Sequence, residues 1–238
     1  MVCNTGVRLT PIVDGKVHTF ETRGLYDGLS VLWDEETKTI WNHVTGVGMY
    51  GPHTGKKLPI ANLFHTTVAA ALEADSTTLV AISERPIMRE SGRWAALAEK
   101  VPVLMPLFKG TMAKVDERRP EMDIGIGVWA DESNARYYPY EALLASGKVI
   151  FDRLGSRRML VYFDPVARAP MAIFTDAQRA AWKGNDLVLS TGEIVRRGSI
   201  YDASGRIRAT ERPLQLFTRW YGWVLTFPKT SLYQPPGA

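Results

Sequence analysis

Cysteine is almost absent from this sequence, and its scarcity excludes a protein held together by internal disulfide bonds. Cys3 is the single cysteine among 238 residues, so no disulfide framework can form within the chain. No apolar run approaches the ~20 residues that a membrane-spanning helix requires, and the opening residues show no signal-peptide pattern. The motifs G-x-S-x-G and H-E-x-x-H are also missing, which removes the usual sequence support for a serine hydrolase or a zinc protease.

The sequence also lacks a concentration of charge of either sign. It holds 29 Lys and Arg against 25 Asp and Glu, for a net charge of +4, and the two signs are interspersed almost everywhere. Proteins that bind nucleic acid usually gather their basic residues on one patch or helix. We therefore expect no nucleic-acid partner. Hydrophobic residues make up 45% of the chain, which is enough for a packed core.

Glycine and proline, by contrast, are plentiful, with 20 and 14 residues. They mark turns between many short apolar segments, a pattern typical of strand-rich proteins. In the first part we predict a hairpin around Asp14-Gly15, strands at Leu29–Trp33, Thr39–Val44 and Thr77–Ser83, and an Ala-rich helix at Thr66–Ala74. In the second part we predict hairpins of Met159–Phe163 with Pro170–Thr175 and of Leu187–Leu189 with Glu193–Arg197, then a turn at 202–205 and a strand near Ser231–Tyr233.

The two parts also share residues at one spacing, which indicates an internal repeat. Leu63-Phe64, Leu72, Thr77 and Leu79 recur 153 positions later at Leu216-Phe217, Leu225, Thr230 and Leu232. Self-similarity at a fixed offset is the mark of duplication. We predict an α+β, mainly β fold, in which two related antiparallel β-rich lobes with short helices meet at a pseudo-twofold axis. The predicted boundaries are 1–83 for the first repeat, 84–120 for a connector and 121–238 for the second repeat.

The connector 84–120 carries eight basic and five acidic residues among apolar ones. Pro102 and Pro106 break any long helix within it. A basic segment of this kind can lie on a membrane surface or against a protein partner. It can also simply pack on the protein's own core, which is the more common arrangement and the one we favour.

Residues that could bind a metal are few. The four histidines include no pair spaced i, i+4, but His43 and His53 bracket a glycine run and could approach each other across a hairpin. Cys3 could supply a soft third ligand, which would suit copper or zinc. The same three residues also define an enzyme alternative, in which Cys3 acts as a thiol nucleophile or metal ligand with His43 or His53.

Three further patterns each have a functional and a structural interpretation. Trp41, Trp220 and Trp223 could form a stacking wall for a ligand, although Trp220 and Trp223 also fit the i, i+3 spacing of a buried helix face. Gly46 to Gly51 match G-x-G-x-x-G, but Pro52 follows, so we predict tight turns rather than a dinucleotide site. The acidic residues at 27 and 34–36 could hold a hard cation or flank a sugar, and polar turns are the simpler interpretation.

Several motifs in combination resemble domain-of-unknown-function family 3179, and the resemblance spans nearly the whole chain. They are Cys3-Asn4-Thr5-Gly6, Asp34-Glu35-Glu36-Thr37, Trp41, Gly46…Gly51-Pro52…Gly55, Phe108-Lys109-Gly110-Thr111-Met112, Gly125-Ile126-Gly127-Val128-Trp129 and Tyr137-Tyr138-Pro139. The family brings no activity with it. Its repeats usually begin with a strand that leads into the cysteine, and a second cysteine often lies two residues away.

This resemblance implies that the first repeat lacks its N-terminal strand and that residues once preceded Met1. An intact mass of the native protein that matched a Met1 start would contradict that expectation. The family also implies a location outside the cytoplasm or in the periplasm. Together with the lack of catalytic motifs, it favours a binding or accessory protein, or a subunit of a membrane-associated assembly, with the metal- or thiol-dependent enzyme as the alternative.

Overall fold

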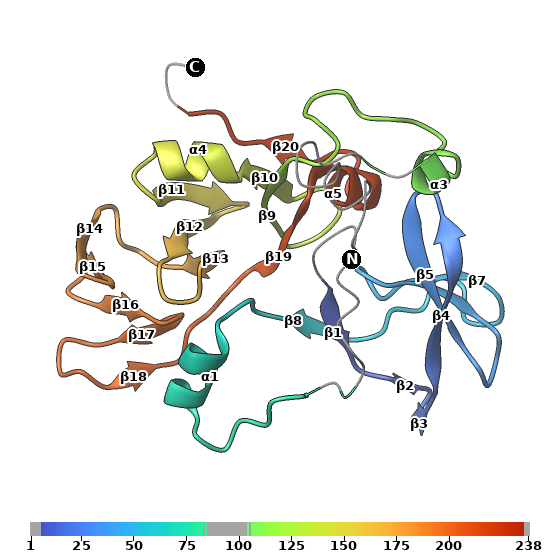
Figure 1. Ribbon diagram of the computed structural model, residues 1–238, viewed down its shortest axis with the longest axis horizontal. Coiled ribbons are helices and arrows are strands. Elements are labelled where there is room, and N and C mark those ends of the chain that lie inside the picture. Colours follow the sequence, from blue (N-terminus) through green and yellow to red (C-terminus); the bar gives the residue numbers. More distant parts are fainter. Residues whose placement is uncertain (1–5, 83, 85–103, 105, 236–238) are drawn as a thin grey trace.

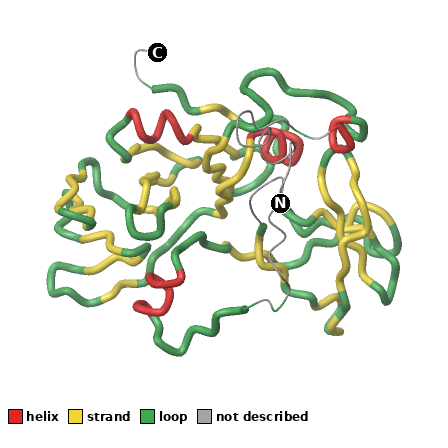
Figure 2. The backbone as a smooth tube through the Cα atoms, viewed as in Figure 1, coloured by secondary structure: helices red, strands yellow, loops and turns green. Residues whose placement is uncertain are grey.

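Strands dominate the fold, as the turn-rich sequence predicts. The computed structural model describes residues 6–82, 84, 104 and 106–235, with 41% strand and 11% helix. Figure 2 shows short strands through the whole body and only brief helical segments. The mainly β class with several antiparallel sheets is therefore confirmed.

The first part of the chain is built on two tight hairpins. Asp14 and Gly15, with φ of 50° and 79°, join β2 (Ile12–Val13) to β3 (Lys16–Val17), because a two-residue turn of this type needs positive φ at both positions. Asp27 and Gly28 join β4 (Phe20–Tyr26) to β5 (Leu29–Asp34) in the same way. The sheet continues through β6 (Ile40–Asn42) to β7 (Gly48–Tyr50), in the order β4-β5-β6-β7. It stands on the right in Figure 1.

A smaller sheet and a helix complete this part. Strand β1 (Val7–Leu9) pairs with β8 (Ile60–Asn62). Helix α1 (Val68–Ala74) follows, and the Thr67 hydroxyl caps it by accepting the Ala70 N–H. The strand predicted at Thr77–Ser83 is wrong over its described residues 77–82. Leu79 and Ile82 stay 95% and 86% exposed, so this β-branched run has no sheet to bury it.

The described residues of the second part form three sheets. The first has the order β19-β9-β10-β20, and the second runs β11-β12-β13. The third is a five-stranded meander, β14 to β18. Their strands are β9 (Ile124–Trp129), β10 (Ala135–Pro139), β11 (Val149–Leu154), β12 (Arg157–Asp164), β13 (Ala169–Phe174), β14 (Ala180–Lys183), β15 (Asp186–Leu189), β16 (Ile194–Arg196), β17 (Ser199–Tyr201), β18 (Ile207–Arg208), β19 (Leu214–Arg219) and β20 (Ser231–Leu232). The predicted hairpins β12–β13 and β15–β16 are confirmed.

The largest aromatic residues fill a core beneath helix α5 (Trp220–Thr226). Trp220 and Trp223 are fully buried there with Trp129 of β9. Val7 and Val44 of the first part belong to the same cluster, so the two parts of the chain share a core. Two shorter helices, α3 (Pro106–Lys109) and α4 (Tyr140–Ala145), lie elsewhere on the surface.

The structure does not confirm the predicted internal duplication. Positions 62 and 215, which are 153 residues apart, meet directly: the Gln215 N–H donates to Asn62 Oδ1 at 2.9 Å. A helix follows each of their strands, but α5 buries five residues and α1 buries only Ala70. The internal duplication therefore stays a prediction.

Part of the connector 84–120 lies outside the described residues, namely 85–103 and 105. Its described end packs on the protein itself. The Gly28 N–H donates to Thr111 Oγ1 at 3.0 Å, and the Ala113 N–H donates to Asp27 Oδ1 at 2.8 Å. Lys109 forms an ion pair with Glu121 at 2.7 Å, so at least this stretch is anchored to the β4–β5 turn and its surroundings.

Candidate functional site

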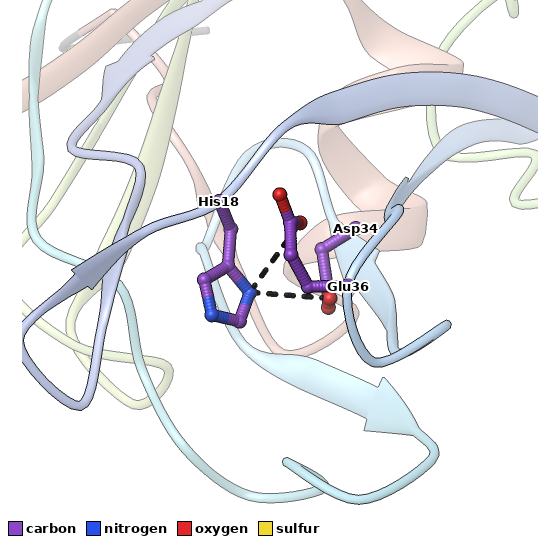
Figure 3. Close-up of side chains that lie close together, drawn as sticks. All are labelled: His18, Asp34 and Glu36. Atoms are coloured by element: carbon purple, nitrogen blue, oxygen red, sulfur yellow. Dashed lines mark hydrogen bonds and ion pairs between the residues drawn. The ribbon is translucent and has the colours of Figure 1, made fainter.

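A histidine and two carboxylates meet at the end of the first four-stranded sheet. His18 lies between β3 and β4, Asp34 ends β5, and Glu36 follows in the next turn (Figure 3). The Nδ1 atom of His18 lies 3.2 Å from Asp34 Oδ1 and 3.8 Å from Glu36 Oε2. Within the described part of the chain, this is the one group of three or more such side chains whose ligand atoms lie within 4.8 Å of one another.

Asp34 is the most buried and most extensively hydrogen-bonded residue of the cluster. Its side chain is fully buried and accepts hydrogen bonds from the Thr37 N–H at 2.7 Å and from Trp41 Nε1 at 2.8 Å. The Thr37 hydroxyl donates to it as well. Burial alone would raise the pKa of Asp34, but the hydrogen bonds from Thr37, Trp41 and His18 outweigh burial and lower the pKa from 3.8 to about 2. Asp34 is therefore a permanent anion at neutral pH.

The ionised Asp34 sets the tautomer of His18. A carboxylate can only accept a hydrogen bond, so Nδ1 of His18 must carry the proton that it donates. The lone pair of the neutral ring then lies on Nε2, the atom left for a ligand. Both Glu36 oxygens accept the Thr19 N–H at 3.0 Å. The carboxylates are thus engaged in holding the loop and the imidazole, and the imidazole is the group that remains available.

His53 supplies a second imidazole. Its ring centre lies 6.0 Å from that of His18 and 6.1 Å from that of Trp41. Its Nδ1 atom is buried and has no hydrogen-bond partner within the described part of the chain. His53 lies in the loop 46–55, which contains the glycine run. The Gly55 N–H donates to the Gly48 carbonyl oxygen at 2.8 Å and closes this loop. A Cβ at Gly48 would lie 2.2 Å from the His53 carbonyl oxygen. The glycines therefore form the predicted tight turns, and these turns position His53.

The two other predicted ligands are His43 and Cys3. His43 follows β6 and is largely buried, and its Nδ1 has no hydrogen-bond partner among the described residues. Burial lowers its pKa despite a hydrogen bond to the Ser30 backbone, which raises it. It does not belong to the close group of ligand atoms described above. Cys3 lies outside the described residues, so the arrangement of Cys3 with His43 and His53 stays a prediction.

The three predicted ligand-wall tryptophans are divided between two cores. Trp41 is fully buried with Val13 and Leu58, whereas Trp220 and Trp223 are fully buried under α5 in another cluster. Trp41 nevertheless takes part in the site, because its indole N–H binds Asp34. Sequence reasoning missed His18 and assigned Asp34 to a polar turn. The available signal was the Asp34-Glu35-Glu36-Thr37 motif, which begins at the end of the second strand after His18.

The depressed pKa of Asp34 predicts a loss of stability in acid. Its pKa is about 2 in the folded protein and 3.8 when unperturbed, so its contribution is complete above pH 4 and disappears as the pH falls towards 2. The expected share is about 2 kcal/mol of the free energy of unfolding. Urea unfolding at several pH values between 6 and 2.5 measures it. Between pH 6 and 2.5, the free energy of unfolding of the Asp34→Asn variant should fall less than that of the wild type, and the difference should equal the Asp34 contribution. If the two proteins show parallel pH profiles, the lowered pKa of Asp34 is contradicted.

One comparison with known proteins gives a match. The family model described as a protein of unknown function, DUF3179, matches residues 1–230. No curated protein and no solved structure matches the chain significantly. Among the helices of the described residues, none is long and apolar enough to cross a membrane.

Proposed function

Because the chain belongs to the DUF3179 family of proteins of unknown function, we propose its function from the site alone: a binding protein that holds a copper or zinc ion between His18 and His53. One observation carries this proposal. An imidazole whose Nδ1–H is held by a buried carboxylate faces a second imidazole 6.0 Å away. Metal-binding histidines characteristically donate the other ring N–H to a carboxylate in this way.

The spacing of the rings fits a shared metal. Imidazole nitrogen binds zinc at ~2.0–2.1 Å, and two rings on one ion then have centres roughly 5–6 Å apart by the same bond lengths. Imidazole suits copper and zinc, whereas magnesium and calcium prefer oxygen. Asp34 and Glu36 already accept several protein hydrogen bonds, so they serve better to orient His18 than to bind the ion.

Two imidazoles leave coordination positions for a further ligand. In the proposal these are taken by water or by a group from a partner, and Cys3 is the soft ligand that the enzyme alternative would place there. The family resemblance supports a role outside the cytoplasm as an accessory subunit. The basic connector 84–120 is the proposed contact with a protein partner or a membrane surface.

Zinc titration by calorimetry tests the proposed ligands. The variants His18→Gln and His53→Gln should each bind zinc at least ~10-fold more weakly than the wild type, because each removes one nitrogen ligand. The variants His43→Gln and His65→Gln are matched controls and should bind as the wild type does. His65 contacts Phe217 and has a burial-lowered pKa, far along the chain from this cluster.

The same titration separates the competing sites. If His43→Gln weakens binding and His18→Gln does not, the ligands are those predicted from the glycine-run hairpin and the proposal is wrong. A loss of binding in Cys3→Ser would add the thiol as a ligand and favour the enzyme alternative. Circular dichroism of each variant shows that a loss of binding is not a loss of fold.

A further inference from the structure

A cavity lies between helix α1 and the strands of the second part, and none of the residues of the histidine cluster lines it. Its volume is about 370 Å³, which falls in the range of small-molecule sites. In Figure 1, α1 lies beside β17 and β18 at the lower edge of the molecule. The cavity is lined from the first part by Phe64, Thr66, Ala70, Ala71 and Ala74, and from the second part by Val166, Ala167, Met171, Arg197, Gly198, Ser199, Thr210 and Arg212.

The small side chains of α1 leave this space open. Ala70, Ala71 and Ala74 face the cavity, and none of them reaches far across it. Helix α5 follows β19 as α1 follows β8, but it fills its surroundings with Trp220 and Trp223. The alanines of α1 therefore form an apolar wall and leave the cavity beside it open. Bulky side chains at these positions would fill that cavity.

A positive charge stands at the end of this apolar wall. The guanidinium of Arg212 donates to the carbonyl oxygens of Ala172, at 3.2 Å, and Gly198, and it stacks over the Phe64 ring at 4.9 Å. These partners are uncharged. Among the described residues no carboxylate forms an ion pair with Arg212, whereas the neighbouring Arg197 pairs with Glu73 at 2.6 Å. A half-buried cation that has no ion-pair partner among the described residues attracts an anion.

We propose that this cavity binds a small amphipathic anion, a fatty acid of short or medium chain length. The carboxylate would pair with Arg212 beside the hydroxyls of Ser199 and Thr210. The alkyl chain would lie along Ala71, Val166 and Met171. Carboxylates match the planar donors of a guanidinium, and an alkyl chain gains from the removal of its apolar surface from water. The site and its ligand are independent of the metal proposed at His18 and His53.

Octanoate binding, followed by calorimetry and by the thermal unfolding temperature, tests the proposal. Octanoate should bind the wild-type protein and raise its unfolding temperature, whereas 1-octanol, which lacks the charge, should bind at least ~10-fold more weakly. The variant Ala71→Leu fills the cavity and should abolish octanoate binding. The control Ala69→Leu carries the same change on the same helix at an exposed position outside the cavity and should bind as the wild type does.

A second variant tests the charge. Arg212→Lys keeps the positive charge but loses the paired N–H donors of the guanidinium. This variant should bind octanoate more weakly than the wild type, whereas the Ala71→Leu variant should not bind it. Binding that survives Ala71→Leu, or no binding of octanoate by the folded wild type, would overturn the proposal. Equal affinity for octanoate and 1-octanol would show a merely apolar cavity and would overturn it too. Inorganic phosphate that binds as tightly as octanoate would assign the site to a free anion instead.

Discussion

Replacement of Asp34 by Asn should lower the free energy of unfolding by about 3 kcal/mol, the scale for removing one partner of a buried charged network. The buried carboxylate accepts from Thr37, Trp41 and His18 through both of its oxygens. An amide keeps one acceptor oxygen and turns an NH₂ group towards donors that need an acceptor. Urea unfolding at pH 7, followed by tryptophan fluorescence, measures the loss.

The matched control for this change is Asp131→Asn. Asp131 also accepts hydrogen bonds from its neighbours Ser133 and Asn134, and these lower its pKa to about 2. Its turn, however, is exposed to solvent, where water replaces a lost partner. We expect a loss below ~1 kcal/mol there. Equal losses in both variants would show that Asp34 is only another turn aspartate and does not organise the cluster.

Zinc binding should fall along with stability in Asp34→Asn. The carboxylate fixes the tautomer of His18, and loss of such an orienting group typically weakens metal affinity by ~10–100-fold. The fall should be measured at a temperature where the variant remains folded. Because Asp34 acts through His18, the double variant Asp34→Asn/His18→Gln should bind no more weakly than His18→Gln alone.

Replacement of Gly127 by Ala, in the second part of the chain, should lower the free energy of unfolding about as much as Asp34→Asn does. Gly127 lies in the middle of β9, opposite Tyr137 of β10 and Leu216 of β19. An added Cβ would lie 2.2 Å from Cε3 of Trp223. The ring cannot move aside freely, because its Nε1 donates to Thr230 Oγ1 at 2.8 Å and its centre lies 4.4 Å from that of Phe227. Overpacking of this kind costs about 3 kcal/mol.

Gly6→Ala provides the control for that substitution. A Cβ at Gly6 would meet no atom of the described residues within 4 Å, so the free energy of unfolding should change by less than ~0.5 kcal/mol. Thermal or urea unfolding of both variants gives the comparison. If Gly127→Ala unfolds as the wild type does, the close packing of α5 on β9 is not as the structure describes.

Local signals in the sequence were sufficient for the hairpins. Asp14-Gly15 specifies its turn by backbone conformation alone, and the Ala-rich run with Thr67 before it specifies α1. Strand β9 was not predicted, because Gly125 and Gly127 weaken its strand signal. Tertiary packing explains why glycine stands in this strand, because a Cβ on Gly125 would lie 2.4 Å from the Tyr138 carbonyl oxygen. The strand predicted at Thr77–Ser83 failed for the converse reason, since propensity without a neighbouring strand does not make a sheet.

The candidate site shows the same limit. The sequence singled out His43 and His53 because they bracket the glycine run, and that pairing stays a prediction. The contact of His53 with His18 was not predicted. The contact between His18 and His53 depends on how the 46–55 loop folds back over Gly48, and no local pattern encodes that closure. Asp34 looked like an ordinary turn residue, because only the fold reveals that Trp41 and His18 both point at it.

The most direct test of the central claim is the X-ray absorption spectrum of the zinc-loaded protein. The wild type should show outer-shell scattering from two imidazole rings, with zinc–nitrogen distances of ~2.0–2.1 Å. His18→Gln and His53→Gln should each show scattering from one ring, and His43→Gln should still show two. A spectrum without imidazole scattering, or one unchanged by both His18→Gln and His53→Gln, would contradict a metal held between His18 and His53.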